Sequence, residues 1–153
     1  MPGNIKIICE NRKARFNYEI ISRFEAGIML TGSEVKSLRA GHASLGDAYG
    51  VIMNSGAYLL QAHISAYQPA RHANHEPLRQ RKLLLHAHEI KKLIGQTQEK
   101  GYTLVPLKLY FKDGLAKLEL ALGKSKKTGD KRETIKKRES DRQVRRVLKQ
   151  SKR

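Results

Sequence analysis

Two stretches of alternating apolar residues, each interrupted by a turn sequence, constrain the fold of this chain more than any other feature. In the longer stretch, apolar residues alternate over 105–111, Lys112-Asp113-Gly114 forms a turn, and the alternation resumes over 118–122. In the other, alternation over 49–53 and over 58–64 flanks Asn54-Ser55-Gly56. Successive side chains of a strand point to opposite faces, so both stretches predict antiparallel hairpins with one buried face. The predicted buried residues are Val105, Leu107, Leu109, Phe111, Leu118, Leu120 and Leu122 in one hairpin, and Tyr49, Val51, Met53, Tyr58, Leu60, Ala62 and Ile64 in the other.

Shorter signals predict the remaining strands. Residues 16–21 (FNYEII) and 81–85 (RKLLL) are the further plausible strands. Pro106 donates no ladder hydrogen bond, which predicts a sheet edge or a bulge within the strand that contains it. Several antiparallel strands within about 110 residues indicate a small barrel or a sandwich.

Two helices are predicted beside these strands. Thr31 and Glu34 form a capping-box pattern at the start of one helix, and Gly41 ends it. Apolar spacing of i, i+3, i+4 and i+7 predicts a longer helix over 88–100, with Gly101 as its C-cap. The predicted fold class is therefore mainly β with peripheral α-helices.

Basic residues divide the chain into two parts. The 153 residues carry a formal net charge of +17, of which +7 belongs to 1–122 and +10 to 123–153. We therefore expect a folded domain over 1–122 and a basic tail over 123–153. The tail contains good helix formers but too little apolar surface to fold alone, so we expect it to be disordered when free and helical on a polyanion. A merely solubilising tail is the alternative.

The same charge indicates a class of partner. So basic a chain favours nucleic acid, an anionic membrane or an acidic protein. The tail has no Trp or Phe to insert into lipid, which favours nucleic acid and no membrane. No apolar run is long enough to span a bilayer, and a single cysteine, Cys9, forms no internal disulfide. A cytoplasmic protein is expected.

Motifs for catalysis are missing from the sequence. It contains no phosphate loop of the form GxxxxGK[ST], no GxGxxG and no HExxH. The six histidines lack the spacing of a metal site. We therefore expect no enzyme activity, no cofactor and no metal.

A few body residues are candidates for contacts with RNA. Glu25 is placed to orient an arginine or to accept a hydrogen bond from a nucleobase amino group. A surface ion pair is an equally simple account of Glu25. Lys36 and Arg39 lie on the polar side of the predicted first helix, where they face either phosphate or solvent.

Several segments together resemble one family. They are NRKAR at 11–15, FEAGI at 24–28, GSEVKSLRAG at 32–41, RKLLL at 81–85, GYTLVPL at 101–107 and DKR at 130–132. In this order they resemble the SsrA-binding protein family, SmpB, from about residue 8 almost to the end of the chain. The resemblance implies an oligonucleotide-binding-like β-barrel and a non-enzymatic adaptor for transfer-messenger RNA (tmRNA) in trans-translation. Such a protein binds the tRNA-like domain of the RNA, delivers it to stalled ribosomes, and fills the empty decoding centre and message channel with its tail.

The resemblance also assigns residues, and with the helix argument it gives two sets. The RNA-binding set is Asn11, Arg12, Lys13, Arg15, Glu25, Lys36, Arg39, Arg81, Lys82, Leu84, His86, Lys124, Lys126 and Lys127. The ribosome-binding set in the tail is Asp130, Lys131, Arg132, Val147 and Leu148. We expect a monomer when the protein is free.

Three positions depart from the family pattern. His86 stands where many relatives have Asn, and Gly129 stands where an aromatic residue or His often precedes Asp-Lys-Arg. Ser140-Asp141 replaces a frequent Trp.

Two alternative functions remain: a generic structured-RNA-binding or ribosome-associated protein, and an enzyme that acts on RNA. The nuclease alternative requires converging carboxylates or histidines, which the sequence does not display.

Overall fold

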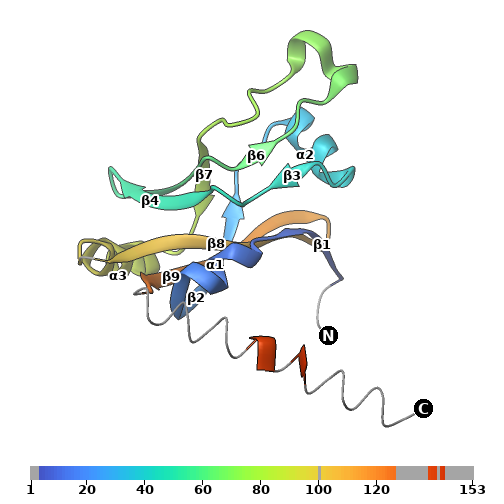
Figure 1. The fold of residues 1–153 in the computed structure, drawn as a ribbon. Coiled ribbons are helices and arrows are strands. Elements are labelled where there is room, and N and C mark those ends of the chain that lie inside the picture. Colours follow the sequence, from blue (N-terminus) through green and yellow to red (C-terminus); the bar gives the residue numbers. More distant parts are fainter. Residues whose placement is uncertain (1–3, 100, 127–137, 141, 144–153) are drawn as a thin grey trace.

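Antiparallel strands are the main secondary structure of the computed structural model, which describes residues 4–99, 101–126, 138–140 and 142–143 (Figure 1). The strands are β1 (Ile5–Glu10), β2 (Tyr18–Ile28), β3 (Ala43–Ser44), β4 (Tyr49–Met53), β5 (Gly56–Leu60), β6 (His63–Ile64), β7 (Arg81–Leu84), β8 (Tyr102–Lys112) and β9 (Leu115–Ser125). The helices are α1 (Arg12–Asn17), α2 (Gly32–Arg39), the 3-10 helix η1 (Gln68–Ala73) and α3 (Ala87–Thr97). The predicted class, mainly β with peripheral helices, is confirmed.

The main sheet closes on itself. Its strand order is β1-β8-β4-β5-β7-β2-β9, and β8 also pairs with β9, so six strands form a ring to which β1 is added at β8. Strands β3 and β6 form a separate two-stranded sheet. Figure 1 shows this small sheet beside α2 on one side of the ring, with the segment around η1 projecting beyond it.

The β8–β9 hairpin forms as predicted, but its buried face changes partway along β8. Asp113 and Gly114 make the turn with φ angles of 50° and 81°. The register shifts between Pro106 and Lys108, so of the two predicted alternatives, a sheet edge or a bulge, the bulge is confirmed. The bulge reverses the alternation, so Val105 and Leu107 pack on Ala14 of α1 instead of sharing the main core with Leu109. The prediction of one continuous buried face was therefore wrong.

The β4–β5 hairpin also forms, with its predicted faces exchanged. The buried side carries Gly50, Ala57 and Leu59, whereas Tyr49 and Met53 are exposed. A Cβ atom on Gly50 would lie 2.8 Å from the Leu104 Cβ, so only glycine allows β4 to approach β8 this closely. Small residues thus occupy core positions of this hairpin. The prediction was wrong because it placed the larger alternating residues on the buried face.

One residue restores the predicted pattern after β5. Gln61 has a φ of 60°, in the left-handed region. It interrupts the alternation, so Ala62 and Ile64 are buried as predicted although Tyr58 and Leu60 are not on the core face.

The predicted helix near Thr31 is confirmed, and other boundaries move. The Thr31 side chain accepts from the Glu34 N–H, and the Glu34 carboxylate accepts from the Thr31 N–H at 2.9 Å. The long helix runs over Ala87–Thr97, shorter than the predicted 88–100. Of the predicted strand 16–21, the first two residues belong to α1, and β1 was not predicted at all.

A buried ion pair joins α2 to the ring. The side chains of Glu34 and Arg81 are both 0% exposed, and the Arg81 Nε donates to the Glu34 carboxylate. Arg81 also donates to the carbonyls of Ala62 at 2.7 Å and Pro77 at 3.1 Å. Arg79 contacts the other Glu34 oxygen at 2.6 Å. The expectation that Arg81 contacts RNA is corrected, because its guanidinium has no surface free for a ligand.

The folded body extends past the expected boundary at residue 122. Gly123, Lys124 and Ser125 pair with β2, and the first two also pair with β8. The tail residues 138–140 and 142–143 are helical and exposed. The state predicted for the rest of the tail falls on residues outside the described part of the chain.

We expect Glu34→Gln to lower the free energy of unfolding by about 3 kcal/mol, because it leaves the buried Arg81 without its countercharge. Urea denaturation measures the change. Glu76→Gln, at an exposed position, is the control and should change stability by less than about 0.5 kcal/mol.

The same pair predicts an acid dependence. Burial by itself would raise the pKa of Glu34, but hydrogen bonds from Arg79, Thr31 and Arg81 outweigh it and hold the pKa below the ordinary 4.5. The stabilisation is therefore present above pH 4.5 and is lost as the pH falls through the lower, folded-state pKa. Equal acid sensitivity of Glu34→Gln and the unsubstituted protein would contradict this account.

Candidate nucleic-acid interface

One outward face of the ring combines charged and apolar side chains from four strands. Gly27 of β2 lies opposite Leu84 of β7, and Glu25 lies opposite Glu119 of β9. Glu119 in turn lies opposite Lys108 of β8. Since alternate residues of a strand share a face, Lys82 also projects on the side of Leu84. We call the set Lys82, Leu84, Gly27, Glu25, Glu119 and Lys108 the outer face.

Two exposed apolar side chains, Leu84 and Met29, lie at the β7 end of the outer face. Leu84 is 52% exposed and Met29 is 53% exposed, although both are large apolar residues. A Cβ atom on Gly27 would lie 3.2 Å from the Leu84 Cβ, so glycine leaves Leu84 the space that it occupies. The flat apolar face of a nucleobase can pack on these two side chains. Lys82 lies beside Leu84, where its ammonium group can contact a phosphate.

Glu25 has its own hydrogen-bonded setting on the outer face. Its Oε2 accepts from the Tyr110 hydroxyl at 2.6 Å and lies 3.4 Å from the Lys112 Nζ. The Tyr110 hydrogen bond, aided by Lys112 and Lys117, outweighs desolvation and lowers the pKa of Glu25. Desolvation and the neighbouring carboxylate raise the pKa of Tyr110. Glu25 is thus an ionised acceptor at neutral pH, and its side chain is 43% exposed.

A cavity of about 280 Å³ lies beside Glu25, and its lining includes Arg23, Lys108, Tyr110 and Glu119. Arg23 and Lys108 both contact the Glu119 carboxylate, at 3.3 Å and 3.2 Å. Donors and acceptors therefore alternate across this part of the outer face. Such a surface suits the edge of a base, which presents both kinds of group.

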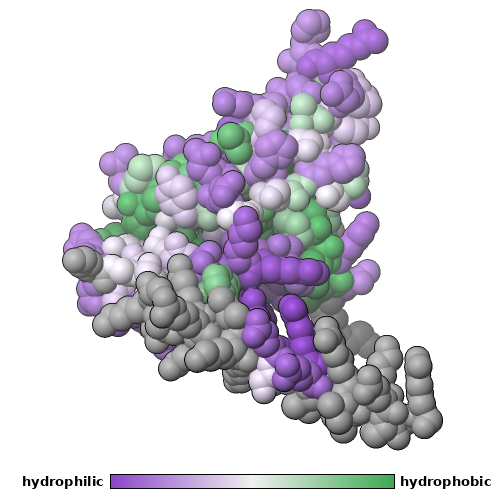
Figure 2. All heavy atoms as spheres, in the orientation of Figure 1, coloured by the Kyte–Doolittle hydropathy of each residue, from purple (hydrophilic) through white to green (hydrophobic). Residues whose placement is uncertain are grey.

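A second, more basic surface surrounds α1. Arg12, Lys13 and Arg15 are exposed there, while Ala14 between them is buried against β8. Lys126 reaches the same helix, since its Nζ donates to the Arg15 carbonyl at 3.1 Å. Figure 2 shows hydrophilic side chains gathered around α1 and the adjacent tail segment.

The remaining predicted residues of the body are dispersed. Lys36 and Arg39 are exposed on α2, where the Lys36 Nζ lies 5.6 Å from the centroid of Tyr67. Lys124 is exposed at the end of β9, with its Nζ 5.8 Å from the centroid of Tyr102. His86 is exposed just before α3 and stacks on His88, with ring centroids 5.5 Å apart.

The structure therefore divides the predicted RNA-binding residues by their location. Glu25, Lys82 and Leu84 share the outer face, and Arg12, Lys13, Arg15 and Lys126 gather at α1. Asn11 is buried, and its side chain donates to the carbonyls of Pro106 at 3.0 Å and Leu45 at 3.2 Å. The structure therefore gives Asn11 a structural role, and its contact with RNA stays a prediction. Lys127, Asp130, Lys131, Arg132, Val147 and Leu148 lie outside the described residues.

Sequence reasoning missed several members of these surfaces. Tyr110 and Lys112 donate hydrogen bonds to Glu25, although they lie 85 and 87 positions later in the sequence. Only the register of the strands shows that these residues meet. Met29, Arg23 and Lys108 were also missed. The alternation of Phe24, Ala26 and Ile28 with Glu25 and Gly27 was a usable signal, because it predicts that the last two face outward.

The described residues offer no metal site or membrane span. Within them, no group of three or more His, Cys, Asp or Glu side chains is arranged to hold a metal ion. None of the helices in that part of the chain has the length and apolar character needed to cross a membrane.

Together, the ring of strands, the outer face and the basic surface at α1 define a class, that of small β proteins with surfaces suited to nucleic acid. The family described as SmpB protein matches residues 8–150. The chain belongs to this family. It is 53% identical to the SsrA-binding protein of Halalkalibacterium halodurans over 148 residues, which cover 97% of this chain and 96% of that protein. It is 55% identical to the SsrA-binding protein of Trichodesmium erythraeum over 146 residues, covering 95% and 94%.

A solved structure is also similar. One chain of a structure described as "tmRNA-SmpB: a journey to the center of the bacterial ribosome" superposes with a TM-score of 0.66 at 47% identity. The match covers 78% of this chain and 85% of that one.

We expect Tyr110→Phe to raise the pKa of Glu25 toward its ordinary value of 4.5, since it removes the main hydrogen bond that favours the carboxylate. An NMR titration of the Glu25 carboxyl carbon measures the shift. Tyr58→Phe, on another strand, should leave that titration unchanged. If Glu25 titrates identically in Tyr110→Phe and the unsubstituted protein, the hydrogen bond does not control its ionisation.

Proposed function

We propose that this protein is an RNA-binding adaptor for tmRNA in trans-translation. It binds the tRNA-like domain of that RNA and delivers it to stalled ribosomes. The chain is more than half identical to proteins named for binding SsrA, the tmRNA, over nearly its whole length. Its structural relative comes from a structure whose description names tmRNA, SmpB and the bacterial ribosome. An adaptor needs no reacting group, so we propose no enzyme activity and no cofactor, with action in the cytoplasm as a monomer when free.

The body would act as an oligonucleotide-binding-like barrel that presents the outer face to the tRNA-like domain. The observation that carries this proposal is the union of Glu25, Gly27 and Leu84 on one exposed surface. An exposed leucine beside a glycine offers shape and apolar contact, and an ionised carboxylate offers an acceptor to a base amino group. Lys82 and the residues at α1 add affinity through phosphate contacts.

The tail would fill the empty decoding centre and message channel. Its proposed ribosome contacts are Asp130, Lys131 and Arg132 at the decoding centre, and Val147 and Leu148 further along the tail. Lys127, which precedes them, is proposed to bind tmRNA together with Lys124 and Lys126. The described tail residues 138–140 and 142–143 are helical, which agrees with a tail that becomes a helix among phosphates. Gly129 removes a stacking group at the decoding centre, so this chain relies there on Lys131 and Arg132.

A second candidate, a generic structured-RNA-binding or ribosome-associated protein, is favoured by the spread of basic residues over several surfaces. A salt series separates the two functions. We expect the protein to prefer the tRNA-like domain of tmRNA over an ordinary tRNA even at high salt, because the outer face contributes contacts that are not electrostatic. Equal binding of both RNAs that collapses with salt would favour the generic protein.

In the same assay, Leu84→Ala should weaken binding of the tRNA-like domain about tenfold, a loss of about 1.4 kcal/mol. Leu115→Ala is the matched control, because Leu115 is also an exposed leucine, 64% accessible, but lies at the β8–β9 turn. Equal effects of the two substitutions would mean that the outer face does not bind this RNA.

Truncation separates body from tail, provided that the cut respects β9. A chain ending at Lys126 should keep its affinity for the tRNA-like domain but lose ribosome rescue in a reconstituted translation assay. A chain ending at Leu122 should also lose stability, because it lacks residues that pair with β2. Rescue at the full rate by the chain ending at Lys126 would contradict the role proposed for the tail.

A further inference from the structure

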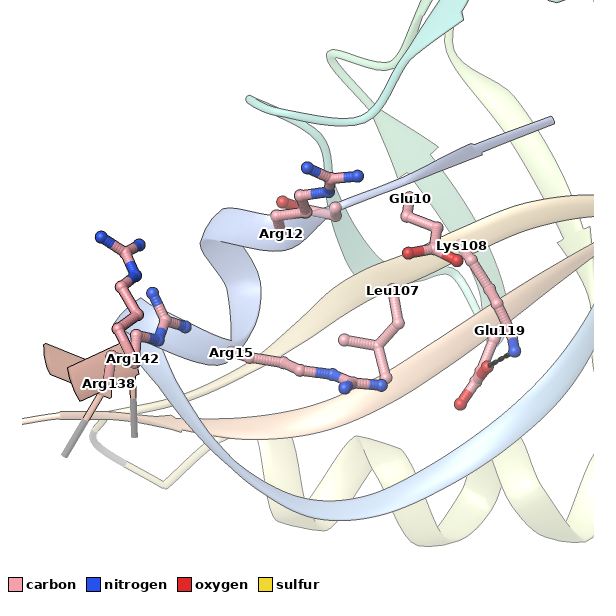
Figure 3. Close-up of a pocket in the computed structure, with 9 residues that line it drawn as sticks. Glu10, Arg12, Arg15, Leu107, Lys108, Glu119, Arg138 and Arg142 are labelled. Atoms are coloured by element: carbon pink, nitrogen blue, oxygen red, sulfur yellow. Dashed lines mark ion pairs between the residues drawn. The ribbon is translucent and has the colours of Figure 1, made fainter. Parts of the chain in front are cut away.

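A cavity of about 360 Å³ lies between α1 and the described tail residues, and most of its charged lining is positive. Arg12 and Arg15 come from α1, and Arg138 and Arg142 come from the tail segment beside it (Figure 3). Lys108 also lines the cavity, together with the carboxylates Glu10 and Glu119. Five cations thus face two carboxylates, and we call this the arginine cavity.

The arginines of this cavity lack anionic partners among the described residues. The only carboxylate of the lining that forms an ion pair there is Glu119, and its partners are Arg23 and Lys108. Arg138 lies over the ring of Phe16 at 5.6 Å, which places the tail against α1 through an aromatic contact. Four arginines thus line one cavity without a carboxylate partner among the described residues, and a bound anion would offset the repulsion among their charges.

The geometry of the cavity favours phosphate groups. Arg138 and Arg142 belong to described helical residues of the tail, and both line this cavity. The planar guanidinium fork matches phosphate oxygens with two parallel hydrogen bonds. The excess of positive charge exceeds what one monoanion neutralises, which favours a ligand that carries several linked anions.

The position of the cavity indicates where such a ligand comes from. Lys108 and Glu119 line both the arginine cavity and the cavity beside Glu25. The arginine cavity therefore borders the outer face, to which Lys108 and Glu119 belong. A nucleic-acid strand that crosses the outer face would place its next phosphates between α1 and the tail.

We propose that the arginine cavity is a phosphodiester-binding site completed by the tail, in which an RNA strand joins Arg138 and Arg142 to Arg12 and Arg15. Binding of RNA then orders this part of the tail against the body. The proposal rests on the proposed function only for the nature of its ligand. Its chemistry requires a phosphodiester chain and no particular RNA fold.

The experiment measures how close the tail comes to α1 in the full-length chain. A spin label is attached at Ser140→Cys, an exposed position of the tail. Burial raises the pKa of the native Cys9 thiol to about 11, so Cys9 reacts slowly at neutral pH. Paramagnetic broadening of the backbone amides of residues 12–17 is followed by NMR during titration with a short oligouridylate.

We expect oligouridylate to increase the broadening at α1. The double variant Arg138→Gln/Arg142→Gln should abolish this increase and weaken binding about tenfold. Loss of two phosphate contacts should also make the slope of log K against log salt shallower by about 1.4. Arg12→Gln/Arg15→Gln should have the same effects, because it removes the other half of the site.

The matched control is Lys149→Gln/Lys152→Gln, which removes the same charge from the same tail and should leave the broadening intact. An equal loss in this control would overturn the proposal, since tail charge alone would then suffice. An equal response to inorganic phosphate at the same phosphate concentration, or to polyglutamate, would also overturn it. So would broadening that is complete without any added anion. Oligouridylate has no tRNA-like shape, so failure here is distinct from failure to bind tmRNA through Leu84.

Discussion

The buried ion pair between Glu34 and Arg81 is the interaction on which the rest of the body depends. It joins residues 47 positions apart, and the same arginine holds the carbonyls that follow β5 and precede β7. Two charges without solvent are costly unless every donor and acceptor is satisfied, and here the capping box of α2 and Arg79 complete the set. The pair therefore sets the position of α2 and of the start of β7, the strand that ends in Leu84.

Local features of the fold were predictable, and features that depend on distant partners were not. Asp113-Gly114 and the Thr31–Glu34 box carry their geometry within a few residues, so the turn and the helix start were predicted correctly. The faces of the β4–β5 hairpin were predicted wrongly, because Gly50 is buried by the approach of Leu104 from β8. The alternation of large and small residues along β4 does not predict that β8 packs so closely against it.

The candidate site shows the same division. The resemblance pointed to Glu25 and Leu84, but their union on one surface follows from the pairing of β2 with β7. Asn11 and Arg81 were assigned to RNA because they lie in segments that resemble the family. Their partners are instead backbone carbonyls and Glu34 inside the protein. Sequence identifies which residues are able to bind a polar group, whereas the fold determines which of them remain available.

Closure of the ring also governs how this protein meets other copies of itself. An open sheet presents unpaired N–H and C=O groups at two edges, and such edges are templates for aggregation. In the described ring, β9 returns to β8, and β1 alone adds a strand with one unpaired side. That strand is short, carries Lys6 and Glu10, and is bulged between Ile7 and Cys9, three features that discourage a further strand from adding. A chain with two long hairpins and several exposed apolar side chains is thereby protected from edge-to-edge association by its topology, and its charge of +17 opposes the contacts that remain.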